Sequence, residues 1–165
     1  MILSLKEELL HRKNELSSPV KSIYFGGGTP SLLTKKELGL LLNEIYNSYS
    51  IDAGVEITLE ANPENISKEA ATSWIELGIN RLSIGLQSFK NEDLKWMNRG
   101  HSHEDNINCI NTVKSVGFTN VSVDLIYGLP GLTRDHWLSF LKQIVSFGIQ
   151  HVSAYCLTVE DKTKL

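Results

Sequence analysis

The sequence predicts an α/β protein built on a parallel sheet, and three observations carry this prediction. Five short β-type runs alternate along the chain with segments whose apolar residues recur at helical spacing. Each intervening segment is long enough to hold a helix, as a parallel connection requires. Ser or Thr residues stand where helices should begin, and glycines stand where several should end. This pattern leaves two architectures open, a doubly wound sheet and a (β/α) barrel.

The expected elements follow one another in strict alternation. The predicted strands are residues 22–25, 55–60, 81–86, 121–127 and 151–159. The predicted helices between them are residues 35–49, 67–78, 104–117 and 134–148. The expected helix caps are Thr34, Ser67 and Thr133, and the expected glycine stops are Gly78, Gly117 and Gly148.

A further helix is predicted at residues 3–16, before the first strand. In a β-α repeat a helix usually follows a strand, so the chain reads as if it begins one strand late. A complete barrel takes about 250 residues, and this chain has 165. We therefore expect residues 1–165 to form a single incomplete domain whose first strand is missing.

Composition excludes several classes of function. Hydrophobic residues make up 41% of the chain and the net charge is -3, so we expect no nucleic-acid partner. Lys6 and Glu7 interrupt the apolar start, and no apolar run reaches membrane-spanning length, so we expect a cytoplasmic protein without a membrane span. Cys109 and Cys156 lie in unrelated contexts and are expected to be buried core residues rather than zinc or disulfide partners.

The first predicted strand ends in the run "GGGTP", residues 26–30. Glycines let backbone N–H groups approach a ligand, and Thr29 adds a hydroxyl. A tight strand-to-helix turn would need one or two glycines, so three favour contact with a ligand. The spacing fits neither a dinucleotide fingerprint nor a nucleoside triphosphate loop.

Polar residues also follow the other strands. Glu60 ends the second predicted strand, and Gln87 ends the third. Arg99 precedes a glycine further along the chain, and Asp124 lies among apolar residues in the fourth predicted strand. Glu60 could be solvated, Gln87 could satisfy backbone groups, and Arg99 could cap a helix, but a carboxylate in a buried strand is costly without a partner. Because carboxyl ends of parallel strands share one edge, we expect these groups to suit a small zwitterion that carries a sugar.

The histidines and tryptophans say less about the ligand site than the residues at the strand ends. The spacing of His101 and His103 does not place them on one helix face, so we expect a solvated turn, with Ser102 or His103 near a helix start. The three tryptophans lie in helical patterns and are expected to pack helices onto the sheet: Trp74, Trp96 and Trp137.

Six ordered motifs resemble those of the radical S-adenosylmethionine superfamily, specifically its oxygen-independent coproporphyrinogen III oxidase-like group. They are "YFGGGTPSLL", "EITLEANPE", "GINRLSIGLQSF", "MNRGH", "DLIYGLPGLT" and "VSAYCLTVE", and they span essentially the whole chain. Within the group, "GGGTPS", "EANP" and "GLPGLT" look more like the haem-chaperone branch than the coproporphyrinogen dehydrogenase branch.

This resemblance implies a partial parallel (β/α) barrel, an incomplete TIM-like core that holds S-adenosylmethionine at its carboxyl mouth. Arg99 would suit the methionyl carboxylate, and the acidic and amide side chains would suit the ribose hydroxyls or the ammonium group. Carried over position by position, the implied cofactor-binding residues are Gly27, Gly28, Thr29, Glu60, Gln87, Arg99, Asp124 and Thr158.

The resemblance also implies a role in haem or porphyrin metabolism. The full-length form would bind haem, S-adenosylmethionine and a 4Fe-4S cluster and pass haem to a client protein; alternatively, it would decarboxylate porphyrinogen propionates through a deoxyadenosyl radical. The family's CxxxCxxC cluster motif does not occur here, and Cys109 and Cys156 do not replace it in number or spacing. We therefore assign no catalytic or metal-binding residue and do not expect the chain as given to catalyse that chemistry. A third possibility is a degenerate barrel without a cluster.

Overall fold

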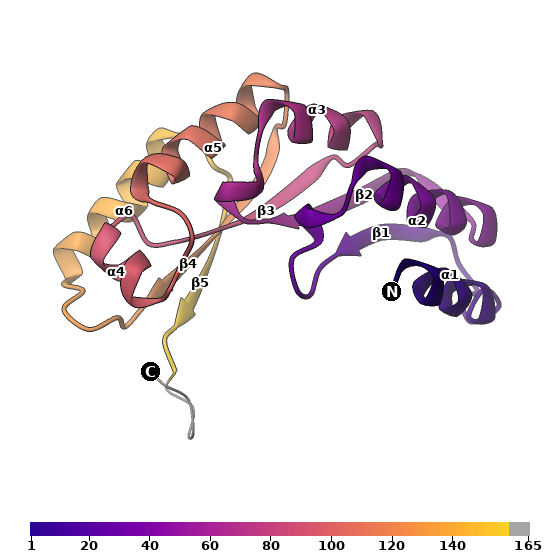
Figure 1. Cartoon of the computed structure of the whole chain (residues 1–165), viewed down its shortest axis with the longest axis horizontal. Coiled ribbons are helices and arrows are strands. Elements are labelled where there is room, and N and C mark those ends of the chain that lie inside the picture. The colour runs from indigo at the N-terminus through magenta and orange to yellow at the C-terminus, as the bar shows by residue number, and fades with distance from the viewer. Residues whose placement is uncertain (159–165) are drawn as a thin grey trace.

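Five parallel strands form one curved sheet in a computed structural model, which describes residues 1–158 (Figure 1). Each strand pairs with the next one in the sequence, so the order across the sheet is the order along the chain. The strands are β1 (Val20–Phe25), β2 (Ile51–Ala61), β3 (Arg81–Gln87), β4 (Asn120–Tyr127) and β5 (His151–Cys156). All five predicted strands are present, although β5 ends at Cys156 rather than at 159, and Val159 lies outside the described residues.

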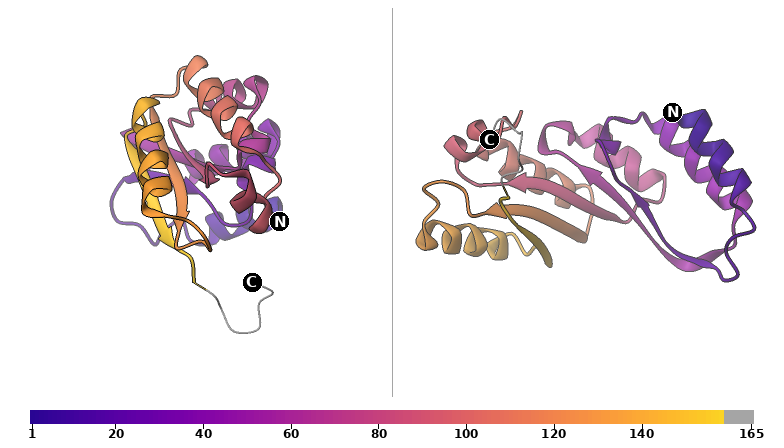
Figure 2. Two further views of the ribbon diagram at one scale, coloured as in Figure 1. Left: turned by 90° about the vertical axis from the view of Figure 1, so that its left-hand side faces the viewer. Right: turned by 90° about the horizontal axis from the view of Figure 1, so that it is seen from below.

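Helices connect the strands, and α2, α3, α5 and α6 lie along the convex side of the sheet (Figures 1 and 2). The short helix α4 follows β3, and α1 packs beside α2 near the β1 end of the sheet. The bounds are α1 (Ile2–His11), α2 (Lys35–Ser48), α3 (Lys68–Glu76), α4 (Asn91–Trp96), α5 (His103–Ser115) and α6 (Arg134–Ser146). Two single 3-10 turns, η1 (Pro30–Leu32) and η2 (Pro63–Asn65), follow β1 and β2.

The strand order decides between the two architectures that the sequence leaves open. A doubly wound sheet reverses its strand order at a switch point, whereas here the order runs from β1 to β5 without reversal. The curved sheet is therefore a half-barrel, which confirms the predicted partial (β/α) barrel. None of the helices in residues 1–158 has both the length and the apolar character needed to cross a bilayer.

The two faces of the sheet differ in character because side chains alternate along each strand. Apolar side chains such as Leu59, Ile84 and Val123 point toward the helices and form the core with Trp74 and Ile110. The alternate positions on the concave face carry polar side chains. The register aligns Glu60 of β2 with Ser83 of β3, and Asp124 of β4 with Ser153 of β5.

The predicted helix boundaries are confirmed where side-chain caps occur. The hydroxyls of Thr34, Ser67 and Thr133 accept hydrogen bonds from backbone N–H groups in the first turns of α2, α3 and α6. Ser102 caps α5 in a capping box with Asp105. The three predicted glycine stops adopt positive φ, at 86° for Gly78, 109° for Gly117 and 68° for Gly148.

Several expectations about individual residues were wrong. Trp96 is 43% exposed at the end of the six-residue helix α4, so it does not pack in the core. Cys156 is exposed at the last position of β5, although Cys109 is buried in α5 as expected. His101 is buried rather than solvated, since its ring lies between the Glu64 carboxylate and the Leu86 carbonyl oxygen.

The opening helix is shorter than predicted. Its pattern predicted a helix over residues 3–16, but α1 ends at His11. None of its residues is buried, so little packing energy opposes fraying at its end. Trp137, in contrast, packs against the core as expected, although it is partly exposed.

Candidate ligand-binding site at the carboxyl ends of the strands

A cavity of about 280 Å³ opens at the carboxyl ends of the strands. Its walls come from the β1–η1 loop and from the ends of β2, β3, β4 and β5. The lining residues are Gly28, Thr29, Pro30, Glu60, Ala61, Asn62, Ser83, Gly85, Gln87, Asp124, Ile126 and Tyr155. Five of the residues implied by the sequence therefore meet at one cavity: Gly28, Thr29, Glu60, Gln87 and Asp124.

The glycine loop after β1 uses conformations that other residues rarely adopt. Gly27 and Gly28 have φ values of 77° and 59°. The Gly27 N–H donates to Glu60 Oε2 at 3.2 Å, and Gly28 lies against the cavity. The loop thus presents bare backbone beside a carboxylate, as the glycine run suggested.

Glu60 is held from two sides. Tyr24 Oη donates to Glu60 Oε1 at 2.8 Å, while the Gly27 N–H reaches the other carboxylate oxygen. Burial, followed by the hydrogen bond to Glu60, raises the pKa of Tyr24 to about 12. The phenol therefore keeps its proton at neutral pH and remains a donor.

Asp124 lies opposite, on β4. Ser83 Oγ lies 3.5 Å from each of its carboxylate oxygens, so these contacts are long and weak. Burial is the main cause that raises the pKa of Asp124, and the negative charge of Glu60 raises it further. A hydrogen bond with Ser153 lowers the pKa, so the protein compensates the charge of Asp124 in part, and a cationic ligand would add to that compensation.

Gln87 occupies an unusual backbone position at the end of β3. Its φ is 68°, and the register of β3 with β4 shifts between Ile84 and Gln87. A Cβ on Gly85 would lie 2.8 Å from Gln87 Nε2 and 3.3 Å from Asn62 Oδ1. Gly85 therefore leaves room for the Gln87 amide at the cavity wall.

Three of the implied residues do not line the cavity: Gly27, which contacts Glu60 instead, Arg99 and Thr158. Arg99 follows Asn98, which has a positive φ of 53°, in the turn between α4 and α5. No hydrogen bond or ion pair of the Arg99 side chain occurs within residues 1–158. Thr158 is exposed two residues beyond β5. For Gly27, Arg99 and Thr158, contact with a ligand stays a prediction.

The cavity also contains residues that the sequence reasoning missed. Ser83, Ile126 and Tyr155 reach it from β3, β4 and β5, and Tyr24 reaches Glu60 from β1. Strand alternation was the available signal for Ile126, which lies two positions beyond Asp124 and so shares its face. The alignment of Tyr155 with Ile126 depends on the register between β4 and β5, which the sequence does not specify.

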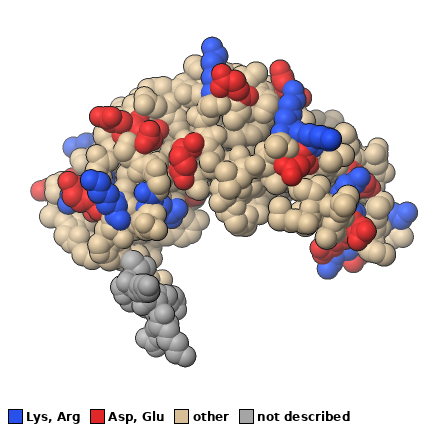
Figure 3. Space-filling model, in the orientation of Figure 1, with Lys and Arg blue, Asp and Glu red and all other residues tan. Residues whose placement is uncertain are grey.

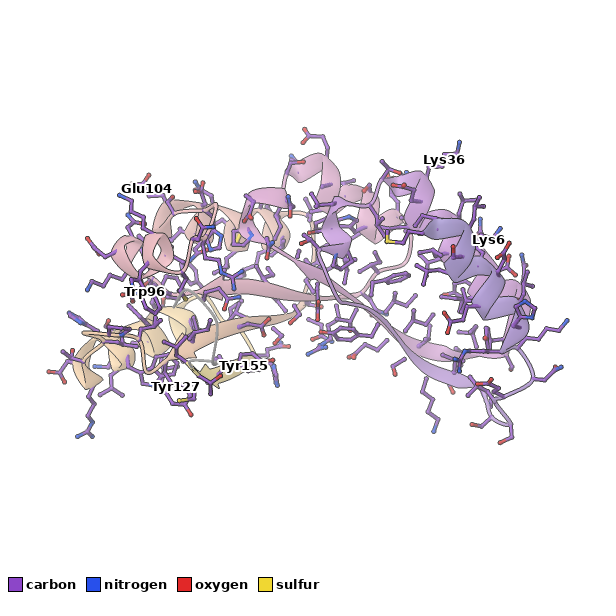
Figure 4. The ribbon with its side chains drawn as sticks, turned by 60° about the horizontal axis from the view of Figure 1, so that its bottom comes forward. Lys6, Lys36, Trp96, Glu104, Tyr127 and Tyr155 are labelled. Atoms are coloured by element: carbon purple, nitrogen blue, oxygen red, sulfur yellow. The ribbon has the colours of Figure 1, made fainter. Side chains whose placement is uncertain are left out.

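The charge of the lining selects between ligand classes. Among the described residues that line the cavity, two are acidic, Glu60 and Asp124, and none is Lys, Arg or His. Lys6 and Lys36 lie at the opposite end of the molecule from Tyr155 (Figure 4). Acidic and basic side chains are interspersed on the face that Figure 3 shows, without a basic patch. The cavity therefore favours a cation and disfavours phosphate.

The residues present do not fit an iron–sulfur cluster. Within residues 1–158 no three His, Cys, Asp or Glu side chains are grouped so that they could hold a metal ion. Burial raises the pKa of Cys109 to about 12, which disfavours the thiolate that binds iron. The other cysteine, Cys156, is exposed on a different element.

Comparison with known proteins identifies the class to which this half-barrel belongs. Residues 3–144 match the family model described as the radical SAM superfamily. The chain therefore belongs to the radical SAM superfamily, as its motifs indicated. This membership agrees with a half-barrel whose polar cavity lies at the carboxyl ends of its strands.

Particular relatives carry the comparison further. The chain is 34% identical over 164 residues to the heme chaperone HemW of Haemophilus influenzae, covering 99% of this chain and 43% of that protein. It is 36% identical over 146 residues to a mitochondrial radical S-adenosyl methionine domain-containing protein 1 of Mus musculus, covering 88% and 33%. The chain thus spans less than half the length of these relatives.

A solved structure gives the same picture of the fold. Coproporphyrinogen III oxidase HemN of Escherichia coli, described as a radical SAM enzyme, superimposes with a TM-score of 0.85 at 29% identity. The match covers 95% of this chain and 36% of the HemN chain. The half-barrel is therefore a close counterpart of part of that enzyme.

Proposed function

We propose that the cavity at the carboxyl ends of the strands binds S-adenosylmethionine. The observation that carries the proposal is the pair of carboxylates, Glu60 and Asp124, in a lining without a basic residue. S-adenosylmethionine carries a sulfonium and an ammonium cation together with ribose hydroxyls, and carboxylates bind all three. When bound, it supplies the adenosyl group that the superfamily uses in radical chemistry.

The individual roles follow from position and chemistry. Glu60, Gln87 and Asp124 would accept hydrogen bonds from the ribose hydroxyls or the ammonium group. The backbone at Gly27, Gly28 and Thr29 would meet the methionyl end. The guanidinium of Arg99 would pair with the methionyl carboxylate through two parallel hydrogen bonds. Thr158 would contact the cofactor from the end of β5.

For the whole protein we propose the function of a haem chaperone in the cytoplasm. Relatives named heme chaperone HemW, at 34% identity over 99% of this chain, support this choice. Because the chain spans 43% of that relative, haem binding and transfer of haem to a client protein are proposed for the full-length form. A 4Fe-4S cluster would require ligands other than the two cysteines present.

A second candidate is oxygen-independent coproporphyrinogen III oxidase, which the TM-score of 0.85 to HemN favours. The two functions separate in one assay of the full-length protein with haem, an apoprotein acceptor and a porphyrinogen. Haem transfer without a decarboxylated product supports the chaperone, and a decarboxylated porphyrinogen supports the oxidase. A full-length protein that shows neither haem transfer nor decarboxylation would support a third candidate, a cluster-less barrel without catalysis.

Calorimetric titration of this chain tests the binding proposal. We expect S-adenosylmethionine to bind about tenfold more tightly than S-adenosylhomocysteine, because the latter lacks the sulfonium charge that two nearby carboxylates attract. ATP should bind weakly, since its phosphates would face the same carboxylates. Equal affinities for the two adenosyl compounds, or stronger binding of ATP, would contradict the proposal.

Charge variants provide the control for this titration. Glu60→Gln and Asp124→Asn should each reduce the preference for the sulfonium. Glu104→Gln removes a carboxylate of the same kind on the exposed side of α5 (Figure 4) and should leave the preference unchanged. A comparable loss in all three variants would indicate a general charge effect rather than this cavity.

A further inference from the structure

We infer that Tyr24 is a positioning residue for the proposed S-adenosylmethionine site and that it acts by holding the Glu60 carboxylate in its binding orientation. The inference rests on the proposed function and deepens it, because none of the implied binding residues is Tyr24. Tyr24 does not itself line the cavity, whereas Glu60 does. Its role would therefore be indirect.

The contacts fix both oxygens of the Glu60 carboxylate. Tyr24 Oη donates to Oε1 at 2.8 Å, and the Gly27 N–H donates to Oε2 at 3.2 Å. Each carboxylate oxygen can accept two hydrogen bonds. One acceptor position on each oxygen therefore remains available for a ligand, while the plane of the carboxylate is determined by the protein.

The backbone at the end of β1 makes room for this arrangement. A Cβ on Gly26 would lie 2.7 Å from Tyr24 Cε1 and 3.0 Å from Glu60 Oε1. Any other residue would push the ring or the carboxylate away, because such contacts are closer than atoms tolerate. Gly26 thus admits the tyrosine ring, and Gly27 supplies the second donor. This accounts for two of the three consecutive glycines.

Tyr24 is not placed there by core packing. It is 56% exposed on the concave face of β1, the opposite side of the strand from buried Ile23. The register pairs Tyr24 with Thr58, so Glu60 lies diagonally across on β2, within reach of a long side chain. An exposed aromatic whose hydroxyl contacts a cavity carboxylate indicates a role in the site rather than in folding.

A double-mutant cycle measured by calorimetry tests the inference. Tyr24→Phe removes the hydroxyl and keeps the ring, and we expect affinity for S-adenosylmethionine to fall about tenfold. In the Glu60→Gln background the same substitution should have no further effect, because Tyr24 acts through Glu60. Tyr46→Phe, on the exposed side of α2, is the matched control and should bind as the wild type does.

A second measurement needs no ligand and can be made even if Tyr24→Phe does not fold. Ultraviolet titration of the wild type should show the raised pKa of Tyr24, and Glu60→Gln should lower that pKa part of the way, because burial remains. An unmoved transition would show that the phenol and the carboxylate are not coupled, which overturns the inference.

The outcomes separate this inference from the proposed function. The positioning role is overturned if Tyr24→Phe binds S-adenosylmethionine as tightly as the wild type does. It is also overturned if Tyr24→Phe lowers the affinity equally in the wild-type and Glu60→Gln backgrounds. Either result leaves the binding proposal standing. Absence of binding by the wild-type chain overturns the proposed function, and the role of Tyr24 with it. Loss of binding in Tyr24→Phe that vanishes in the double mutant supports both.

Discussion

A carboxylate on the concave face can bind a ligand, but its charge can also lower the stability of the folded chain. Asp124 has weak contacts from Ser83 on the concave face, and burial is the main cause that raises its pKa. Its negative charge is therefore unfavourable in the folded chain at neutral pH. Residues that lower stability in this way are often retained for function.

Replacing Asp124 should stabilise the chain and weaken ligand binding together. Because its pKa is raised above the unfolded value of 3.8, its contribution to stability is fully present below pH 4 and is lost as the pH rises through the folded pKa. Asp124→Asn should thus raise the free energy of unfolding at pH 7, by less than about 1 kcal/mol because solvent screens a half-exposed group.

Urea unfolding at pH 3 and pH 7 measures this difference. The variant and the wild type should differ little at pH 3, where both carry a neutral side chain, and more at pH 7. A variant that is less stable than the wild type at pH 7 would contradict the account, as would unchanged affinity for S-adenosylmethionine.

Sequence reasoning located residues at strand ends better than it judged their exposure. Glu60, Gln87 and Asp124 could be named because the carboxyl ends of parallel strands meet at one edge. The role of Tyr24 could not be predicted from the sequence, because its contact with Glu60 depends on the register of β1 with β2 and on the space beside Gly26. His101 was misjudged because its partners come from β3 and η2, distant in the sequence.

At the level of elements, local signals determined most boundaries. The caps at Thr34, Ser67 and Thr133 form hydrogen bonds within the next turn, so three or four residues of sequence suffice to predict them. The end of α1 depends instead on tertiary packing, which is sparse for this helix. The periodicity of its leucines therefore overstated its length.

Gly39 offers a test of helix energetics in α2. A Cβ there would make an ordinary contact of 3.5 Å with Leu77 Cδ2, so Gly39→Ala should fit without strain. It should raise the free energy of unfolding by about 0.5–1 kcal/mol, because alanine restricts the unfolded chain and favours the helix. Urea denaturation of the variant measures the change.

Gly85→Ala is the contrasting variant. Its Cβ would lie 2.8 Å from Gln87 Nε2 and 3.3 Å from Asn62 Oδ1, so the end of the flexible Gln87 side chain must move, and stability should rise less than in Gly39→Ala. If Gly39→Ala destabilised the chain, the contact with Leu77 would have to be tighter than the structure gives it. A larger gain in stability from Gly39→Ala than from Gly85→Ala would support the packing described for both sites.

At the scale of the whole molecule, the half-barrel separates stability from binding. Apolar side chains between sheet and helices provide the core, while the concave face carries polar groups that lead to the cavity. The alternation of strands and helices was sufficient to predict a parallel sheet, and the resemblance indicated a partial barrel. The sequence alone could not exclude a doubly wound sheet, because strand order is a property of long-range pairing.

Two cavities lie at opposite ends of the sheet, so a titration can show which of them a ligand occupies. The proposed site is at the carboxyl ends, and a second cavity of about 290 Å³ is lined by Gly117 and Gly148 at the amino ends of β4 and β5. A ligand that follows the chemistry of Glu60 and Asp124 should occupy the first cavity and leave the second unaffected.

The most direct measurement is a two-dimensional amide NMR titration of the chain with S-adenosylmethionine. We expect the amide signals of Gly27, Gly28 and Tyr155 to shift, and those of Gly117 and Gly148 to stay in place. Such a pattern would place the ligand at the carboxyl ends of the strands. Shifts confined to Gly117 and Gly148, or no shifts at saturating concentration, would contradict the proposal that this half-barrel binds S-adenosylmethionine through its acidic cavity.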